Sequence, residues 1–346
     1  MSIITLPQLI DPHVHFRTPG LDHKEDWQTG SKAALAGGFT TVLDMPNTKP
    51  PTTTAELLEQ KRKIAQKDAM VNYGFHFAAS TDNWNEIKKV RDKIASVKVF
   101  LNFSTGNLKI DDDRILEKIF SVSPIISCHA EGEMVELAIK LTKKCGNKLY
   151  LCHISTKDEI EYIKKNKTKD IFVEVTPHHL FLKNENIKDG FWEMYPNLKS
   201  QSNVDALWQA IEDGTVDTIG SDHAPHTKKE KQQDDFPRGI PGLESSLPLM
   251  LDAVNNGMLK LERLIELMST NPTKIFHIPI REDCRTIVDM TLKKEVKNEN
   301  LYTKCGWSPF DGWQLTGWPI KTIINGETVF DNNSINNNFR GEEIYN

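Results

Sequence analysis

Eight short apolar runs recur along the chain, and the stretches between them have helical character. The runs cover residues 9–16, 40–45, 72–79, 97–102, 124–130, 149–155, 171–176 and 218–221. Between runs, residues 54–68 and 131–144 place apolar side chains at i, i+3 and i+4 with charges opposite. Near-continuous apolar strands that alternate with helices favour a parallel sheet buried on both faces. Eight such units predict an α/β protein built as a (β/α)8 TIM barrel. An open doubly wound sheet is the competing architecture.

The pattern changes after the eighth run. Residues 244–256 and 259–269 are the last candidate helices, and short strands follow at 286–290, 313–315, 322–324 and 327–330. Asn325-Gly326 joins the last two as a hairpin signal, and residues 332–346 read as a polar tail. We therefore divide the chain into a barrel with C-terminal helices over residues 1–285 and a short β extension with its tail over residues 286–346.

Composition narrows the class of protein. With 346 residues, 38% of them hydrophobic, the chain can bury one large core plus a small appendage. A net charge of -5 offers no attraction for nucleic acid or an anionic membrane, and no apolar run approaches the length that spans a membrane. The five cysteines are scattered without CxxC pairs, which fits free thiols in a reducing compartment. We expect a cytoplasmic protein with no nucleic-acid or membrane partner.

Metal-type side chains stand at the ends of several predicted strands. His13 and His15 end the first, with Arg17 two residues further, and alternation along a strand lets all three face one space. The others are His129, His153, His178, His179, Asp222, His223 and His226. Barrel enzymes place their chemistry at the carboxyl ends of their strands, and imidazoles and carboxylates are common metal ligands. Ligand-type residues at four strand ends predict a metal site more strongly than a single motif does.

Lys98 lies within the fourth strand, where its side chain points into the barrel. An unpaired buried ammonium costs several kcal/mol, by order of magnitude. A carboxylate such as that of Asp222 could pair with it, it could form a Schiff base, or its neutral amine could add carbon dioxide. We favour the carbamate, because the histidines supply too few anionic groups for two divalent ions and a carbamate can bridge two metals.

Longer motifs carry a resemblance to a known family. They are LIDPHVHFRTPG, HKEDWQTGSKAALAGGFTTVLDMPNTKPP, KVFLN, CHAE, LCHIS, VEVTPHHLFL, SDHAPHT and PGLESSLPLML. Over about residues 6–276 the chain resembles the dihydroorotases of the amidohydrolase superfamily, and especially the dihydroorotase domain of the animal multifunctional pyrimidine-synthesis protein. The resemblance implies a barrel of the metal-dependent hydrolase type. It also implies reversible cyclisation of N-carbamoyl-L-aspartate to L-dihydroorotate and water in pyrimidine (UMP) biosynthesis.

The resemblance also implies a role for each matching residue. His13, His15 and Asp222 would hold one zinc and His129 and His153 the other, with carbamylated Lys98 and a hydroxide as bridges. Two zinc ions would lower the pKa of the bridging water and polarise the carbonyl. Asp222 would be the general acid and base. The substrate would be bound by Arg17, Asn47 and His226. A loop beginning at Asn102 would cover it, with Ser104 or Thr105 as the hydroxyl contact.

A third zinc is associated with the animal domain, and here its candidate ligands are Cys152, Glu174 and His179. We favour a buried structural role for Cys152, because on a regular strand it points away from its neighbour His153. The loop at 102–107 departs from the animal domain's pattern. Lys199 stands where many relatives have a guanidinium nearby. The metal motif begins at residue 11, so we expect the β extension to be reduced.

Two other functions compete with this one. Allantoinase or hydantoinase activity would leave Arg17 and Asn47 without the α-carboxylate that they would bind. An inactive dihydroorotase-like scaffold would be expected to lack metal ligands, and all of them are present here. From the resemblance we also expect a homodimer, and we consider an association with aspartate transcarbamoylase.

Overall fold

The computed structural model describes residues 2–104 and 108–345, and its centre is an eight-stranded parallel sheet. The strands follow chain order around this sheet. They are β2 (Ile10–Val14), β3 (Thr41–Asp44), β4 (Asn72–Ala78), β5 (Ser96–Phe100), β6 (Ile125–His129), β7 (Lys148–Leu151), β8 (Ile171–Val175) and β9 (Thr218–Ile219). A parallel bridge between Val14 and His223 brings the first strand next to the segment after the last one. The predicted TIM barrel is confirmed, and the open sheet is excluded.

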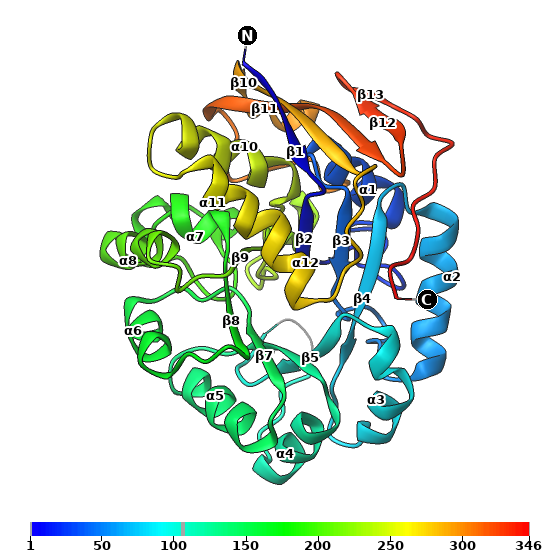
Figure 1. The fold of residues 1–346 in the computed structure, drawn as a ribbon, viewed down its shortest axis with the longest axis vertical. Coiled ribbons are helices and arrows are strands. Elements are labelled where there is room, and N and C mark those ends of the chain that lie inside the picture. Colours follow the sequence, from blue (N-terminus) through cyan, green and yellow to red (C-terminus); the bar gives the residue numbers. More distant parts are fainter. Residues whose placement is uncertain (1, 105–107, 346) are drawn as a thin grey trace.

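Helices surround these strands (Figure 1). They are α1 (Trp27–Ala36), α2 (Ala55–Asp68), α3 (Trp84–Val90), α4 (Asp113–Val122), α5 (Glu133–Cys145), α6 (Lys157–Asn166), α7 (Pro177–Phe181), α8 (Gln201–Glu212), α9 (Lys228–Lys231), α10 (Leu243–Asn255), α11 (Leu261–Ile265) and α12 (Asn271–Ile275). The helices predicted over residues 54–68, 131–144 and 244–256 are confirmed as α2, α5 and α10. The helix predicted over 259–269 begins as α11 and continues as a π-helical turn, Glu266–Thr270. None of the helices in the described part of the chain is both long and apolar enough to span a bilayer.

A second, antiparallel sheet lies beside the barrel (Figure 1), in the order β1, β10, β11, β12, β13. Its strands are β1 (Ile3–Pro7), β10 (Arg285–Glu295), β11 (Gln314–Ile324), β12 (Glu327–Asp331) and β13 (Ser334–Ile335). Asn325 and Gly326 both have positive φ, as a tight hairpin turn requires, so the predicted hairpin is confirmed. Strand β1 was not predicted from the sequence, and β11 was predicted as two separate strands.

The end of the chain lies against the barrel. A backbone bridge joins Tyr73 of β4 to Glu343, and the Ile344 amide donates to the Tyr73 carbonyl at 2.9 Å. The Tyr345 hydroxyl donates to the Phe276 carbonyl at 2.7 Å. The predicted polar tail is therefore wrong for this segment, because its last residues supply both backbone partners and apolar side chains to the barrel.

A buried ion pair supports the strand that carries the first histidines. Lys61 of α2 and Asp44 of β3 are fully buried, and Lys61 Nζ lies 2.6 Å from Asp44 Oδ2. Asp44 also accepts a hydrogen bond from the Phe16 amide at 2.8 Å, directly after His15. Burial lowers the pKa of Lys61 and raises that of Asp44. The pair thus connects α2 to the carboxyl end of β2.

We predict that Lys61→Met lowers the free energy of unfolding by about 3–5 kcal/mol, because it leaves the Asp44 carboxylate buried without its cation. Urea unfolding followed by circular dichroism measures this effect. The double variant Lys61→Met, Asp44→Asn should recover part of the loss, since no charge is then buried alone. A loss below 1 kcal/mol for the single variant would contradict the argument.

Candidate metal centre

A pocket opens at the carboxyl ends of the barrel strands. Of the residues singled out in the sequence, it is lined by His13, His15, Arg17, Asn47, Lys98, Ser104, His129, His153 and Asp222. Five further residues complete its described wall: Phe100, Tyr195, Ala224, Arg238 and Gly239. The structure therefore brings together residues from His13 to Gly239, which lie more than 200 positions apart in the sequence.

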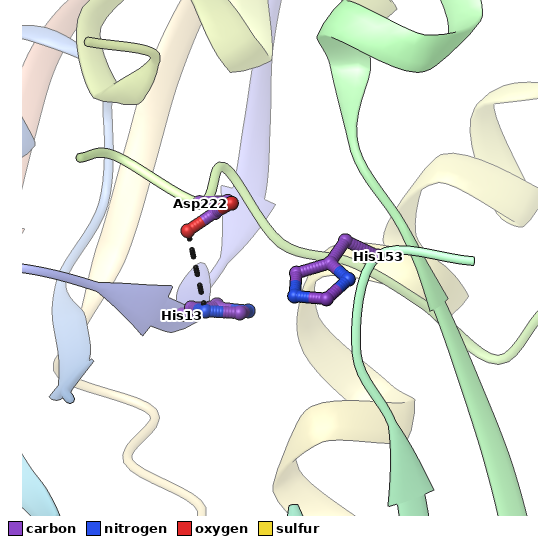
Figure 2. A group of neighbouring side chains, drawn as sticks. All are labelled: His13, His153 and Asp222. Atoms are coloured by element: carbon purple, nitrogen blue, oxygen red, sulfur yellow. Dashed lines mark ion pairs between the residues drawn. The ribbon is translucent and has the colours of Figure 1, made fainter. Parts of the chain in front are cut away.

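Asp222 and two histidines converge on one point. Asp222 Oδ1 lies 3.3 Å from His13 Nε2 and 3.1 Å from His15 Nε2. Ligand atoms at about 2.0–2.1 Å from a tetrahedral zinc stand about 3.3 Å apart, so these separations fit ligands of a common ion. Figure 2 shows that Asp222 faces His13 across the end of β2 and that the His153 ring points toward the same space. His13, His153 and Asp222 form a group able to hold a metal.

The second predicted pair, His129 and His153, is also in place. His129 Nδ1 lies 3.0 Å from His153 Nε2. Burial lowers the pKa of His129 to about 3 and that of His153 well below its usual value, so both rings are neutral at pH 7 and able to donate a lone pair. At His13, burial is outweighed by the charges of Glu174 and Asp222, which raise its pKa to about 10. The same negative field attracts a metal cation.

Lys98 enters this centre without a carboxylate partner. Its side chain is 1% exposed, and its Nζ contacts Cys152 Sγ at 3.0 Å. Among residues 2–104 and 108–345, no acidic side chain forms an ion pair with it, so the ion pair with Asp222 considered above is absent. A buried ammonium in this position is costly, and the cost favours chemistry that removes its charge.

Three residues of the pocket have backbone conformations that are unusual for residues other than glycine, and these conformations orient their side chains. Arg17, His153 and Asp222 have φ values of 63°, 38° and 45°, in the left-handed region that side chains other than glycine rarely adopt. At His153 this turn ends the regular strand, so Cys152 and His153 both face the barrel interior. Our expectation that Cys152 points away is therefore wrong, since it assumed strand geometry through residue 153.

Glu174 contacts two of the candidate metal ligands, His13 and His153, on the side away from the pocket. Its carboxylate is fully buried and contacts His13 Nδ1 at 2.8 Å, the Tyr150 hydroxyl at 2.7 Å and the His153 amide at 2.9 Å. A carboxylate on Nδ1 leaves Nε2 of His13 free to bind metal. His13, Cys152 and Glu174 also form a group that could hold an ion. His179 is not part of that group, because its ring contacts Thr176 Oγ1 at 2.7 Å and the Pro196 carbonyl at 3.0 Å.

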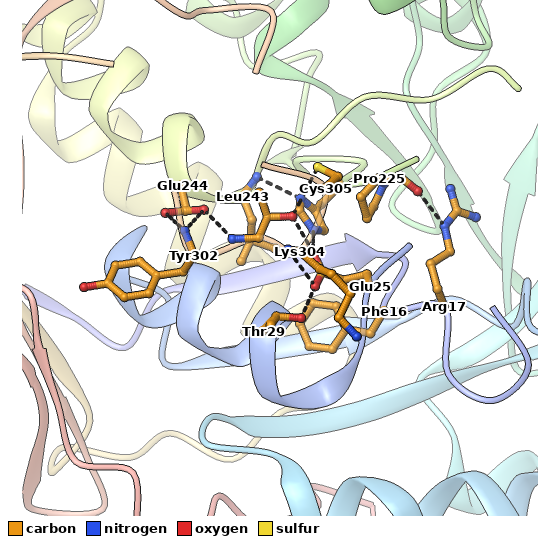
Figure 3. Close-up of polar contacts among 12 residues, drawn as sticks. Phe16, Arg17, Glu25, Thr29, Pro225, Leu243, Glu244, Tyr302, Lys304 and Cys305 are labelled. Carbon is orange, nitrogen blue, oxygen red and sulfur yellow. Dashed lines mark hydrogen bonds and ion pairs between the residues drawn. The ribbon is translucent and has the colours of Figure 1, made fainter. Parts of the chain in front are cut away.

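Arg17 is held at the pocket by the segment after β9. Its Nε donates to the Pro225 carbonyl at 3.3 Å, as Figure 3 shows, and its Nη2 lies 3.2 Å from His226. His226 lies behind this wall rather than on it, since Lys24 Nζ and the Arg238 carbonyl contact its two ring nitrogens, each at 3.0 Å. The structure thus places the His226 ring against Arg17, and its predicted contact with substrate stays a prediction.

Next to Asp222, His223 belongs to a buried network with Glu25. His223 Nε2 lies 3.2 Å from Glu25 Oε2, and Glu25 also accepts a hydrogen bond from Thr303 Oγ1. Thr303 lies on the segment between β10 and β11. Figure 3 shows that the backbone amide of its neighbour Tyr302 donates a hydrogen bond to the Glu244 carboxylate of α10. The segment between β10 and β11 is thereby tied to the loop that carries Asp222.

The remaining predicted residues have separate outcomes. Asn47 and Ser104 line the pocket, whereas Thr105 lies outside the described residues. Lys199 is not on the described wall and lies 3.8 Å from the Glu131 carboxylate. Tyr195, Arg238 and Gly239 were not predicted, because these residues come from long loops and have no regular spacing from a strand end.

Comparisons with known proteins agree with this geometry. Residues 4–329 match the model of the Amidohydrolase family. Over 99% of its length, the chain is 36% identical to "Dihydroorotase" from Pyrococcus abyssi, of which it covers 87%. It is 37% identical over 95% of its length to "Multifunctional protein pyr1-3" from Dictyostelium discoideum but spans only 15% of that protein. The L-hydantoinase from Arthrobacter aurescens superposes with a TM-score of 0.91 at 27% identity, covering 96% of this chain and 86% of its own.

We predict that Glu174→Gln weakens metal binding about 10–100-fold, because an amide orients the His13 ring less firmly than a carboxylate does. Titration of the metal-free protein with zinc, followed by calorimetry, measures the change. Glu117→Gln, which removes a half-exposed carboxylate on α4, is the matched control and should bind zinc like the wild type. Equal affinity in the two variants would show that Glu174 does not support the metal ligands.

Proposed function

The chain belongs to the amidohydrolase family and within it to the dihydroorotases, and from this membership we propose that it interconverts N-carbamoyl-L-aspartate and L-dihydroorotate in pyrimidine biosynthesis. One observation carries the proposal: the pocket combines a set of metal ligands with Arg17 and Asn47 on the same wall. The ligands suit a metal-assisted reaction of an amide, and the guanidinium suits the substrate's carboxylate.

The donor set fits two zinc ions. His13, His15 and Asp222 would hold one and His129 and His153 the other, with Lys98 as a carbamate between them. The 3.0–3.3 Å spacing of the donor atoms and the unpaired burial of Lys98 support this assignment. Bound there, two zinc ions would polarise the amide carbonyl and lower the pKa of water.

The chain's own groups supply the rest of the chemistry. Asp222 is 8% exposed and lies at the pocket wall, where its carboxylate can take a proton and return it to the ring nitrogen. Ring closure consumes one proton and releases one water, so a group that moves protons at the reacting atoms is required. Arg17 would orient the substrate through its α-carboxylate.

A hydantoinase-like activity is the competing enzymatic assignment, since a hydantoinase superposes closely on this chain. The barrel is common to both activities and does not separate them. Arg17 and Asn47 support the dihydroorotase, because hydantoin has no carboxylate for them to bind. The complete ligand set argues against an inactive scaffold.

Three further expectations belong to this proposal. His13, Cys152 and Glu174 lie close enough to share an ion, but His13 is already assigned to the first zinc and Glu174 orients its ring, so we keep two zinc ions per chain and a structural role for Cys152. From the resemblance we also expect a homodimer, and we consider an association with an aspartate transcarbamoylase, since one similar protein is itself multifunctional. Elemental analysis of the pure protein and light scattering with and without that enzyme test these points.

We predict that Lys98→Ala abolishes turnover of both substrates and lowers the zinc content, because in the proposal the Lys98 carbamate would supply an anionic ligand to the zinc ions. Dihydroorotate consumption followed at its ultraviolet amide band measures activity. Carbon-13 bicarbonate should give a carbamate signal in the wild type that the variant lacks. Lys140→Ala, an exposed change on α5, is the control. An active Lys98→Ala protein would overturn the metal assignment, and a zinc-loaded wild type inactive on both substrates would overturn the function.

We predict that Arg17→Gln raises the KM of both substrates about 10–100-fold, the loss expected for one charge-assisted hydrogen-bond pair. Hydantoin lacks the carboxylate, so any slow hydrolysis of hydantoin should not change. Steady-state kinetics in both directions provide the test. A loss of hydantoin turnover equal to the loss on dihydroorotate would assign Arg17 to the metal centre instead of the substrate.

A further inference from the structure

Arg238 places a second guanidinium on the pocket wall. It follows β9 on the segment that leads to α10 and lines the pocket together with Arg17. Apart from the histidines, the basic side chains on the described wall are Arg17, Lys98 and Arg238. In the proposed function Lys98 becomes a carbamate and Arg17 binds the α-carboxylate. The proposed mechanism assigns no role to Arg238.

Aromatic rings hold the Arg238 side chain in position. Its Cζ lies 5.6 Å from the centroid of the Tyr195 ring and 4.8 Å from that of Phe236. Its Nη1 donates to the Phe236 carbonyl at 3.2 Å. Tyr195 in turn contacts the Phe103 ring, edge to face with centroids 6.1 Å apart. Stacked guanidiniums keep their charge while losing little freedom on binding an anion.

The backbone around Arg238 is fixed as well. Lys231 is buried, and its ammonium donates to the carbonyls of Glu193, Pro237 and Gly239, each at 3.0 Å. The carbonyl of Arg238 itself contacts His226 Nε2 at 3.0 Å. Residues on both sides of Arg238 are therefore anchored. The His226 ring also lies 3.2 Å from Arg17 Nη2, so it packs between the two segments that carry the guanidinium groups.

We propose that Arg238 is a specificity-determining residue that favours open-chain dianions over cyclic monoanions. The inference rests on the proposed function. N-carbamoyl-L-aspartate carries two carboxylates, and closure of the ring with uptake of a proton leaves dihydroorotate with one. A second guanidinium in a partly desolvated pocket adds binding energy mainly for the ligand with the second charge.

The equilibrium between the two substrates limits how a binding preference for one of them can change the kinetic constants. The equilibrium constant between the two substrates does not depend on the enzyme, so kcat/KM must change by the same factor in both directions in any variant. Loss of Arg238 therefore raises the KM of N-carbamoyl-L-aspartate together with the kcat for its closure, or lowers both kcat/KM values equally. Direct binding of unreactive ligands isolates the charge preference from these rates.

The test measures dissociation constants by calorimetry on the zinc-loaded protein. N-acetyl-L-aspartate is an open-chain dianion that cannot close, because it lacks the terminal amino group, and orotate is a planar ring with one carboxylate. Arg238→Gln should weaken N-acetyl-L-aspartate about tenfold and orotate less than twofold. Arg238→Lys, which keeps the charge, should lose less than Arg238→Gln. Arg91→Gln, an exposed loss of the same charge far from the pocket, should change neither constant.

The same ligands also report on the wild type, without any substitution. Raising the sodium chloride concentration should weaken N-acetyl-L-aspartate more than orotate, because the dianion meets two cations. Equal changes for the two ligands, or none, in Arg238→Gln would overturn the specificity role. These constants do not require turnover. A wild type that binds both ligands but converts neither substrate would therefore count against the proposed function and not against the role of Arg238.

Discussion

The barrel closes around one buried carboxylate, and the geometry of the candidate metal centre depends on that closure. Asp11 Oδ1 accepts hydrogen bonds from the amides of His13 and Ser221, each at 3.1 Å. The His15 amide then donates to the His223 carbonyl at 2.8 Å. Burial raises the pKa of Asp11 to about 7, so its charge is destabilised and these two amides are valuable partners. Because the first and last strands meet here, Asp222 comes within 3.3 Å of both histidines.

Polar groups continue from this closure into the barrel. Glu174 joins His13, Tyr150 and His153, and His76 contacts Ser96 and the Pro12 carbonyl at 2.7 and 3.0 Å. Many barrels fill this volume with branched apolar side chains. Here Glu174 and His76 contact candidate ligands or their neighbours, and an apolar replacement would lower the desolvation cost but release the imidazoles. The interior is therefore built for the metal centre at some cost in stability.

The parts that could be predicted from the sequence are those governed by repetition. Apolar strands with period-two side chains locate His13, Lys98 and His129, since all three lie on regular strands or directly at their ends. The inward turn of Cys152 was not predictable, because it depends on a left-handed residue at His153 that only tertiary packing enforces. Strand β1 was missed because Ile3–Pro7 is short, and its pairing partner, β10, lies more than 270 residues away.

This division between regular strands and loops also bears on substrate choice. His13, His15, Lys98, His129, His153 and Asp222 are the candidate metal ligands that line the pocket, and we call them its floor. A hydantoinase has the same barrel fold. A metal floor selects for a reacting amide but does not distinguish a substrate with a carboxylate from one without it. Arg17, Asn47 and Arg238 lie on segments that follow β2, β3 and β9. Loops of this kind generally tolerate substitutions better than the strands they connect. We therefore expect the substrate specificity of this protein to depend on the charged side chains that these loops place at the pocket, Arg17 and Arg238.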